Sequence, residues 1–459
     1  MPHPRKATPA ALAAALLAAG LTPLVLAAPA GAAVAKQYDD FNGDGHRDLA
    51  YLGYNRDNHR GGAVTIVYGG TNGLDTSHTQ VIDQDSAGVP GSGEEDDMFG
   101  DSLTSADLNK DGYADLVVGN QTEHVGSARY RGSVTVVWGS RSGLSGGTNV
   151  APKGGAAGAQ GHFGSDLATG DFTGDGSPDL AVIGGGEAWL YRGPFTKAGR
   201  TGTVSEIDKV GAQWYSTGLA AGKVNGDGKA DLVVLGEQFT GTNDTPALRA
   251  WFLKGASSGL TSGASKTLES AWHGGLGANA VVADFDKDGY GDIAIGQPDK
   301  DKGKGAVTVW RGTSAGPSGS TTLTQATAGV SGSPETDDDF GYDVSAADTD
   351  GDGYADLAVG VPHEDVDGKQ DQGGAHVFRG GSGGLTGTRS AWIPQTVAGR
   401  ADSDTAFGYS LRLRDLTGDG KADLAIALSG GGILLPGTAT TPTASGAVVL
   451  PDLGGGFQD

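Results

Sequence analysis

The chain has 459 residues, of which 83 are glycine and none is cysteine, and 55 Asp and Glu against 32 Lys and Arg give a formal charge of −23. Such an acidic chain is not expected to bind nucleic acid. The lack of cysteine excludes disulfide bridges and a lipoprotein-type anchor.

The first segment, residues 1–35, is expected to be a signal peptide. A basic start precedes an Ala/Leu-rich run that ends near Ala28, and small residues offer cleavage after Ala32 or Ala35. No later stretch approaches the roughly 18 uninterrupted apolar residues of a membrane span. We therefore expect a secreted protein with no membrane span, in which residues 36–459 form the mature domain.

Seven segments of the chain repeat one pattern, in which carboxylates surround a glycine and a short apolar run follows. The first positions of these segments are residues 40, 107, 171, 223, 284, 348 and 415, which are 52 to 67 residues apart. A unit of that size recurring along a chain indicates one supersecondary module per repeat, and such modules stack or close into a ring.

Each acidic segment has the spacing of a calcium loop. Side-chain oxygens at positions 1, 3, 5 and 9 and a backbone carbonyl at position 7 can surround one ion if the chain turns sharply, which glycine at position 6 permits. Calcium suits such a ring of oxygens better than magnesium, which keeps its waters. The predicted ligands are Asp40, Asn42, Asp44, His46, Asp48; Asp107, Asn109, Asp111, Tyr113, Asp115; Asp171, Thr173, Asp175, Ser177, Asp179; Asp284, Asp286, Asp288, Tyr290, Asp292; Asp348, Asp350, Asp352, Tyr354, Asp356; and Asp415, Thr417, Asp419, Lys421, Asp423.

The loops are not expected to bind equally well. In the fourth loop, Lys223 replaces the first aspartate, so we predict that this loop holds its own ammonium group or is closed, which leaves about six sites. Neutral Thr173 and Thr417 at position 3 lower the ligand charge of loops three and seven. Loops five and six, with four aspartates each, are predicted to bind most tightly.

An EF-hand does not fit these loops, because position 12 is Tyr, Val or Ile instead of the bidentate Glu that an EF-hand requires. The residues after each loop instead have the apolar pattern of a strand. Phe-Gly often precedes the loop, at Phe99, Phe163, Phe340 and Phe407, and Tyr215 and Leu276 are expected to fill that slot in repeats four and five.

A variable polar stretch, a third strand, a glycine-rich turn and a weaker fourth strand complete each repeat. Seven four-stranded antiparallel units without helical periodicity predict an all-β fold, a seven-bladed β-propeller with calcium loops between first and second strands. Two closures of the ring are possible. Either residues 34–39 form the first strand of blade one and Gly446–Leu450 the last strand of blade seven, or the tail Leu453–Asp459 adds to blade one.

The Phe-Gly pairs, the acidic loops and Gly-x-Pro at Gly296–Pro298 and Gly360–Pro362 resemble the FG-GAP repeats of integrin α-chain propellers. They are also similar to the propeller region of glycosylphosphatidylinositol-specific phospholipase D and to bacterial secreted FG-GAP proteins. The resemblance covers residues 34 to about 450. It implies the propeller fold, and it is less specific about function.

The loops suggest where a partner would bind. A full set of ligands in six loops favours a structural ion, which stabilises the fold. Connections between second and third strands, and between blades, then lie on the opposite face, which meets ligand in the integrin propeller. These connections include residues 54–60, 120–131, 298–304 and 362–372. We expect a monomeric binding or adhesion module for an extracellular protein or glycan.

Two alternatives remain. An extracellular hydrolase, phospholipase-like or polysaccharide-active, or a polysaccharide lyase would need His, Arg, Tyr and carboxylates at the channel mouth opposite the calcium loops. We assign no catalytic residue, because Gly-x-Ser-x-Gly around Ser257, Ser314 and Ser382 matches hairpin turns rather than a nucleophile elbow. A lectin would use aromatic pairs at equivalent positions, where Trp138 and Trp310 are instead expected to pack in the core.

Overall fold

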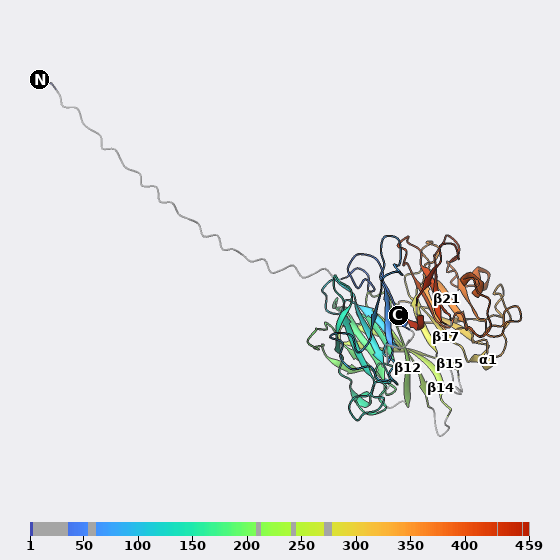
Figure 1. Cartoon of the computed structure of the whole chain (residues 1–459), viewed down its shortest axis with the longest axis horizontal. Helices are drawn as coiled ribbons and strands as arrows, with labels where there is room; N and C mark the ends of the chain where they lie inside the picture. The colour runs from blue at the N-terminus through green and yellow to red at the C-terminus, as the bar shows by residue number, and fades with distance from the viewer. Residues whose placement is uncertain are drawn as a thin grey trace.

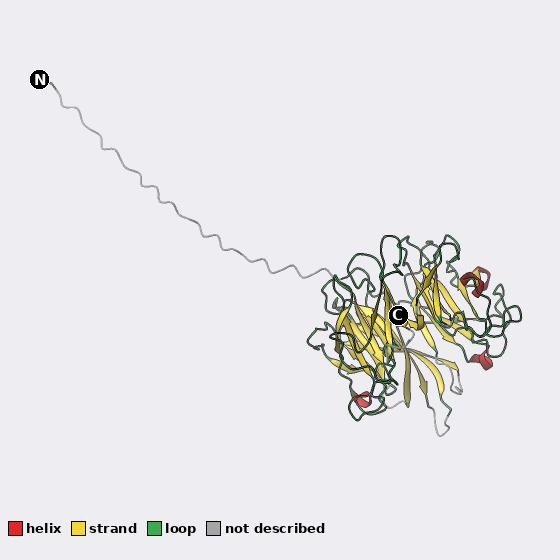
Figure 2. Cartoon of the chain, viewed as in Figure 1, coloured by secondary structure: helices red, strands yellow, loops and turns green. Residues whose placement is uncertain are grey.

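The computed structural model describes residues 1–2, 35–53, 61–207, 213–239, 245–269, 278–428, 430–451 and 453–458. These residues form seven four-stranded antiparallel sheets that follow one another around a ring (Figure 1). Strands make up almost all of the regular structure, and the few helical turns lie in connections (Figure 2). The predicted seven-bladed β-propeller is confirmed.

Each blade takes its strands in order from the ring axis outward. Blades one to three contain β28 (Leu453–Phe457), β1 (Leu49–Gly53), β2 (Ala63–Val67), β3 (Thr79–Ile82); β4 (Leu103–Ala106), β5 (Asp115–Asn120), β6 (Ser133–Trp138), β7 (Ser145–Asn149); and β8 (Asp166–Gly170), β9 (Asp179–Gly184), β10 (Glu187–Tyr191), β11 (Val204–Glu206). Blades four and five contain β12 (Trp214–Gly222), β13 (Asp231–Gln238), β14 (Ala247–Ala256), β15 (Gly259–Glu269); and β16 (Asn279–Ala283), β17 (Asp292–Gln297), β18 (Ala306–Trp310), β19 (Ser320–Leu323). Blades six and seven contain β20 (Val344–Ala347), β21 (Asp356–Val361), β22 (Gly374–Phe378), β23 (Ser390–Pro394); and β24 (Leu411–Arg414), β25 (Asp423–Leu428), β26 (Gly431–Leu435), β27 (Val448–Leu450). The helical turns are η1 (Gly154–Ala157), α1 (Lys300–Gly303), η2 (Gly387–Arg389) and η3 (Gln395–Ala398).

Burial varies with the place of a strand in its blade. Second strands such as β5, β9 and β21 are buried at every residue, because both faces of each blade pack on a neighbouring blade. This explains why their sequences are continuous apolar runs after the loop aspartate. Fourth strands such as β3 and β19 lie at the rim and are mostly exposed.

Among the described residues, the core consists of seven hydrophobic clusters, one at each junction between adjacent blades. The cluster between blades two and three, for example, contains Val136 from β6 and Leu180 from β9. The cluster between blades seven and one combines Leu434 of β26 with Tyr51 of β1. The apolar side chains therefore join the blades to each other around the whole ring.

The Phe-Gly pairs connect neighbouring blades. Phe99, Phe163, Phe340 and Phe407 are fully buried. The backbone of Phe163 at the start of blade three pairs with Gly132 at the start of β6 in blade two, and Gly305 and Gly373 pair in the same way with Phe340 and Phe407. A Cβ on Gly132 would lie 2.3 Å from the amide nitrogen of Phe163, so only glycine permits this approach.

The ring closes through the C-terminal tail. β28 pairs antiparallel with β1, so that Phe457 lies opposite Tyr51. The tail also contacts blade two, where the side-chain amide of Gln458 donates to Ser105 Oγ at 3.0 Å. The expectation that residues 34–39 form the first strand of blade one is wrong, since residues 35–39 contain no strand, whereas the tail alternative is confirmed.

One prediction about the Phe-Gly slot is wrong. Tyr215 does not fill it in repeat four, because its side chain is 47% exposed. Side chains alternate between the two faces of a strand, and in β12 the inward position belongs to Trp214, which packs against the cluster between blades three and four. Leu276 lies outside the described residues, as do residues 54–60 and most of the predicted signal peptide.

Candidate functional site

The aspartate at position 1 organises each of the six complete acidic loops. Asp284 illustrates the arrangement: one carboxylate oxygen accepts from the amide of Asp288 at 3.1 Å, and the other accepts from the amide of Gly289 at 2.9 Å. The equivalent carboxylates that accept from the amides of their own loops belong to Asp40, Asp107, Asp171, Asp348 and Asp415. Each loop is thus folded around this first carboxylate.

The aspartate at position 9 is buried and ties the loop to its own blade. Asp115 accepts from the amide of Leu108 at 3.0 Å and from the amide of Gly139, which follows the third strand, at 2.9 Å. The same bond from the glycine or equivalent turn residue after the third strand recurs at Asp48, Asp179, Asp231, Asp292, Asp356 and Asp423. These bonds show that the first and third connections of a blade share one face of the ring.

Burial raises the pKa of the position 9 carboxylates. Desolvation brings the pKa of Asp48 and that of Asp115 to about 8, and the pKa of Asp179 and that of Asp292 to about 6. The neighbouring loop carboxylates raise these values further, and backbone hydrogen bonds oppose the shift. A cation within the loop would favour the ionised form of such groups.

The structure gathers the carboxylates most closely in loops five and six. Oxygens of Asp284, Asp286 and Asp288 lie within 4.8 Å of one another, and so do oxygens of Asp348, Asp350 and Asp356 (which occupies position 9). Oxygens that surround one calcium ion at about 2.4 Å are at most about 4.8 Å apart, so this donor set fits calcium. Among the described residues, the other loops do not bring three carboxylates this close.

The remaining predicted ligands form hydrogen bonds that hold the turn of their own loop. At position 7, the amides of His46, Tyr113, Ser177, Tyr290, Tyr354 and Lys421 donate to the carboxylate at position 5 of their own loops. At position 3, the side-chain oxygens of Asn42 and Asn109 accept from the amides of Asp44 and Asp111. Thr417 instead donates its hydroxyl to Asp423 at 3.3 Å.

Loop four is neutralised by lysine, but not by the residue expected. Lys223 is exposed and forms none of the ion pairs found among the described residues. Asp227 instead pairs with the ammonium groups of Lys229 at 3.8 Å and Lys254 at 3.5 Å. Against the effect of burial, the backbone amide of Lys229 and then these two charges lower the pKa of Asp227. Asp231 retains its bond to the turn, so this loop has its structural tie without the cluster of carboxylates.

The face opposite the acidic loops carries a pocket near the ring axis. A cavity of about 350 Å³ is lined by Tyr342, His363, Asp404, Tyr409 and Leu453, among others. His363 Nδ1 lies 2.7 Å from Asp339 Oδ2, an interaction that raises the pKa of His363. The pocket therefore combines two phenol rings and an imidazole with carboxylates.

Only one residue of this pocket, His363, was among the loop residues expected on this face. Tyr342 and Tyr409 lie in connections between blades, which were expected on this face, but neither residue was singled out there. A signal for them does exist. Each directly follows a Phe-Gly pair, where Asp101 and Ser165 stand in blades two and three.

A second aromatic group lies at the junction of blades two and three. Tyr130 packs edge-on against His124 with ring centroids 4.8 Å apart and stacks on His162 at 6.0 Å. All three side chains are partly exposed. His124 and Tyr130 belong to the segment 120–131 that was predicted to face a partner.

The ring axis itself holds a cavity of about 400 Å³ toward the acidic loops. Small side chains of the first strands line it, together with Tyr38, Arg412 and Arg414. Arg414 lies over the Tyr38 ring at 4.6 Å and pairs with Asp39 at 3.5 Å. Among the described residues, no histidine lines this cavity. The pocket on the opposite face has a histidine, two tyrosines and a carboxylate in its lining, but not the arginine that was also expected of an enzyme site.

Two sequence signals have structural explanations. Ser257, Ser314 and Ser382 lie in turns between third and fourth strands, which confirms that their motifs are not nucleophile elbows. Trp138 and Trp310 are each 5% exposed and belong to the clusters between blades. Core packing therefore accounts for both tryptophans.

Known proteins resemble this chain in the same repeats. The FG-GAP repeat family matches residues 99–137, 276–310 and 340–378, and the FG-GAP-like repeat family matches residues 171–234. Integrin alpha-PS2 of Drosophila melanogaster is 29% identical over 225 residues, which cover 44% of this chain and 15% of that protein. Phosphatidylinositol-glycan-specific phospholipase D of Rattus norvegicus is 35% identical over 148 residues, or 31% of this chain and 17% of that protein.

Thus the matched region spans less than a fifth of the length of these two relatives. Among solved structures, the Dos1 propeller aligns over 90% of this chain and 85% of its own, with 11% identity and a TM-score of 0.42. In the part of the chain that the structure describes, no helix has the length and apolar composition needed to cross a membrane.

Proposed function

We propose that this chain, a β-propeller built from FG-GAP repeats, is a secreted module that binds an extracellular protein or glycan on the face opposite its acidic loops. One observation carries the proposal: the pocket that Tyr342, His363 and Tyr409 form near the ring axis on that face. Its walls come from connections that a rigid ring holds in place, as is common for recognition sites.

The chemistry of the pocket favours a glycan. Tyrosine and histidine rings present apolar faces against which a sugar ring can pack, and their polar edges can hydrogen-bond to hydroxyl groups. Asp404, which is exposed at the rim, adds an acceptor for sugar hydroxyls. A volume of about 350 Å³ lies within the usual range of small-ligand pockets.

Calcium would act on the other face as a structural ion. Asp284, Asp286 and Asp288 offer only oxygen ligands, and a bound ion would neutralise their mutual repulsion. An ion that binds only the folded chain stabilises it by mass action, so loops five and six would contribute most. Loop four would hold none, because lysines already pair with Asp227.

A glycan and matrix-protein array, probed with the mature chain in calcium and again in chelator, tests the proposed function. We expect binding to a limited set of glycans or proteins in calcium, with loss in chelator only to the extent that the fold is lost. The Tyr342→Ala variant should lose this binding while keeping the circular dichroism of the parent chain. Equal binding by the parent and the variant would refute the assignment of the pocket.

A second candidate, a polysaccharide-active enzyme, is favoured by the His363–Asp339 pair beside Tyr342. A histidine that a carboxylate orients can transfer protons, and a tyrosine nearby can do the same. Incubation with polysaccharides should then produce new reducing ends or unsaturated sugars, and His363→Ala should abolish them. If neither product forms from any polysaccharide that the array identifies, this candidate is rejected and the binding module stands.

A further inference from the structure

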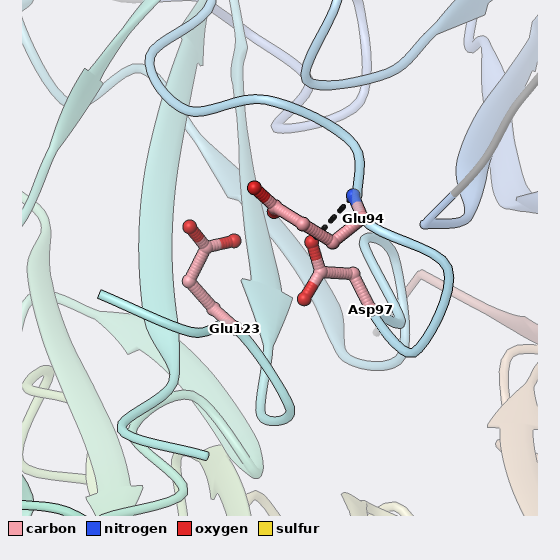
Figure 3. Close-up of side chains that lie close together, drawn as sticks. All are labelled: Glu94, Asp97 and Glu123. Atoms are coloured by element: carbon pink, nitrogen blue, oxygen red, sulfur yellow. Dashed lines mark hydrogen bonds between the residues drawn. The ribbon is translucent and has the colours of Figure 1, made fainter. Parts of the chain in front are cut away.

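A third group of carboxylates lies at the junction of blades one and two, on the face opposite the acidic loops. Oxygens of Glu94, Asp97 and Glu123 lie within 4.8 Å of one another. Glu94 and Asp97 come from the connection between β3 and β4, and Glu123 follows β5. Figure 3 shows the three carboxylates turned toward one another.

One carboxylate oxygen of this group is buried and has no hydrogen-bond partner. Asp97 is 6% exposed, and its Oδ2 accepts from the amide of Glu94 at 3.0 Å. Its other oxygen, Oδ1, is buried and accepts no hydrogen bond from any described residue. A buried carboxylate oxygen in this position costs free energy unless a cation or a proton compensates it.

Neutral side-chain amides hold Glu123 in place. Glu123 is 7% exposed, and its Oε2 accepts from the side-chain amides of Gln84 and Asn120. Among the described residues, none of Glu94, Asp97 and Glu123 forms an ion pair within 4.0 Å of a basic group.

The fold does not need carboxylates at this place. Two residues before the phenylalanine of Phe-Gly, where blade two has Asp97, blade three has Gly161 and blade seven has Thr405. Thr405 is buried, and its hydroxyl accepts from the amide of Gln395 at 2.6 Å. A neutral pair thus closes the junction between blades six and seven, so the acidic group between blades one and two calls for another explanation.

We propose that Glu94, Asp97 and Glu123 bind a calcium ion at the junction of blades one and two, on the face opposite the acidic loops. All the donors are oxygens, which suits a hard cation, and their spacing suits the 2.3–2.6 Å bonds of calcium. Glu94 is exposed, so an ion can reach the site from solvent. The ion would join the blade-connecting segment to the loop after β5.

A related junction differs in one respect. Between blades five and six, Gln325, Glu335, Asp338 and Glu364 repeat the types and spacing of Gln84, Glu94, Asp97 and Glu123. Gln325 likewise donates to Glu364, at 2.6 Å. Within the described part of the chain, however, this second set is not among the groups whose carboxylates gather within 4.8 Å. The proposed site is therefore confined to the first junction.

Equilibrium dialysis with radioactive calcium tests the site, using the full mature chain. Glu123→Gln and Asp97→Asn should each bind one ion fewer than the parent. The control Glu95→Gln removes the same charge from an exposed neighbour and should bind the parental number. Parental binding by both site variants, or an equal loss in the control, would overturn the proposal.

A second measurement tests the site on the parent chain, so it remains valid if the variants fail to fold. Crystals of the parent chain grown in calcium should show an anomalous difference peak between the three carboxylates. No peak there, in crystals whose acidic loops contain calcium, would overturn the proposal and leave the loop sites intact. Asp350→Asn in loop six separates the two cases in solution, because it should remove a loop ion while Glu123→Gln still removes one more.

Discussion

At the scale of single residues, the position 9 aspartates have a role that does not depend on metal. Asp115 joins the start of its loop to the turn after the third strand through two backbone amides. Each amide is buried with the carboxylate and needs an acceptor. The seven copies of this tie explain why even loop four, which lacks the carboxylate cluster, retains Asp231.

Asp115→Asn should therefore destabilise the chain even in chelator. The amide offers one acceptor oxygen for two backbone donors, and an unsatisfied buried N–H costs about 1–3 kcal/mol. Urea unfolding in chelator measures the loss. Asp111→Asn, in the same loop but partly exposed, is the control and should change the unfolding free energy by less than about 1 kcal/mol. Equal midpoints for the two variants would contradict the role assigned to Asp115.

His376 gives the stability a pH dependence. It is buried among Phe340, Phe378 and Trp392, and desolvation lowers its pKa from 6.5 to about 4. Between these values the unfolded chain binds more protons than the folded chain, so stability rises with pH. This contribution is present above pH 6.5 and is lost as the pH falls toward 4, at a cost of about 3 kcal/mol.

The substitution His376→Thr tests this contribution, because threonine occupies the equivalent position in β2, β6 and β18. The quantity to compare is the change in unfolding free energy between pH 7.5 and pH 5 for the parent and the variant. The difference between the two chains cancels the opposite effect of the buried aspartates. A parent that loses no more stability than the variant on acidification would show that His376 is accessible to protons when folded.

At the scale of elements, the glycines that start the third strands set how closely the blades approach. Gly132→Ala should be strongly destabilising, because its Cβ would meet the Phe163 backbone at 2.3 Å. Gly126→Ala, in the same connection, is a matched control, since it also has a positive φ but has no atom within 4 Å. We expect unfolding free energies that differ by about 1–3 kcal/mol. Equal values would mean that the blades can separate without cost.

The repeated elements could be predicted from sequence, because each blade restates the same local chemistry. Glycine at position 6 and an apolar run after position 9 define a loop and a strand within a dozen residues. The closing strand, Leu453-Gly-Gly-Gly-Phe457, was one of two closures between which the sequence did not decide. Three glycines disfavour a strand, and its partner β1 lies some 400 residues earlier.

The pocket lined by Tyr342 and the carboxylate group of blades one and two were missed for the same reason. Tyr342, His363 and Tyr409 become neighbours only when blades six and seven pack together. Asp97 and Glu123 are 26 positions apart and carry no motif that joins them. Tyr215 is a different case. The sequence correctly predicted a large side chain packed in the core at the start of blade four, but that side chain belongs to the adjacent Trp214.

At the scale of the whole molecule, closure of the ring depends on β28. Leu453 and Phe457 belong to the cluster that joins blade seven to blade one. A chain that ends at residue 452 should leave this cluster open, unfold at a lower temperature and be cleaved faster by protease near β1 and β27. Val449→Ala alters an exposed residue of the neighbouring strand and should change neither property. A truncated chain as stable as the parent would show that the ring does not need its tail.

The two faces of the ring are assigned different tasks, structural ions on one and recognition on the other. Substitutions on the two faces should therefore have separable effects. Tyr342 lines the pocket on the recognition face, whereas Lys197 lies near Asp111 on the face of the acidic loops. Neither residue belongs to the core clusters between the blades.

The most direct test of this division is the affinity of the ligand found on the array for Tyr342→Ala and Lys197→Ala, measured by calorimetry in calcium. We expect the Kd to be at least tenfold higher for Tyr342→Ala and unchanged for Lys197→Ala. The reverse result, with binding lost on the loop face and kept at the pocket, would contradict this division.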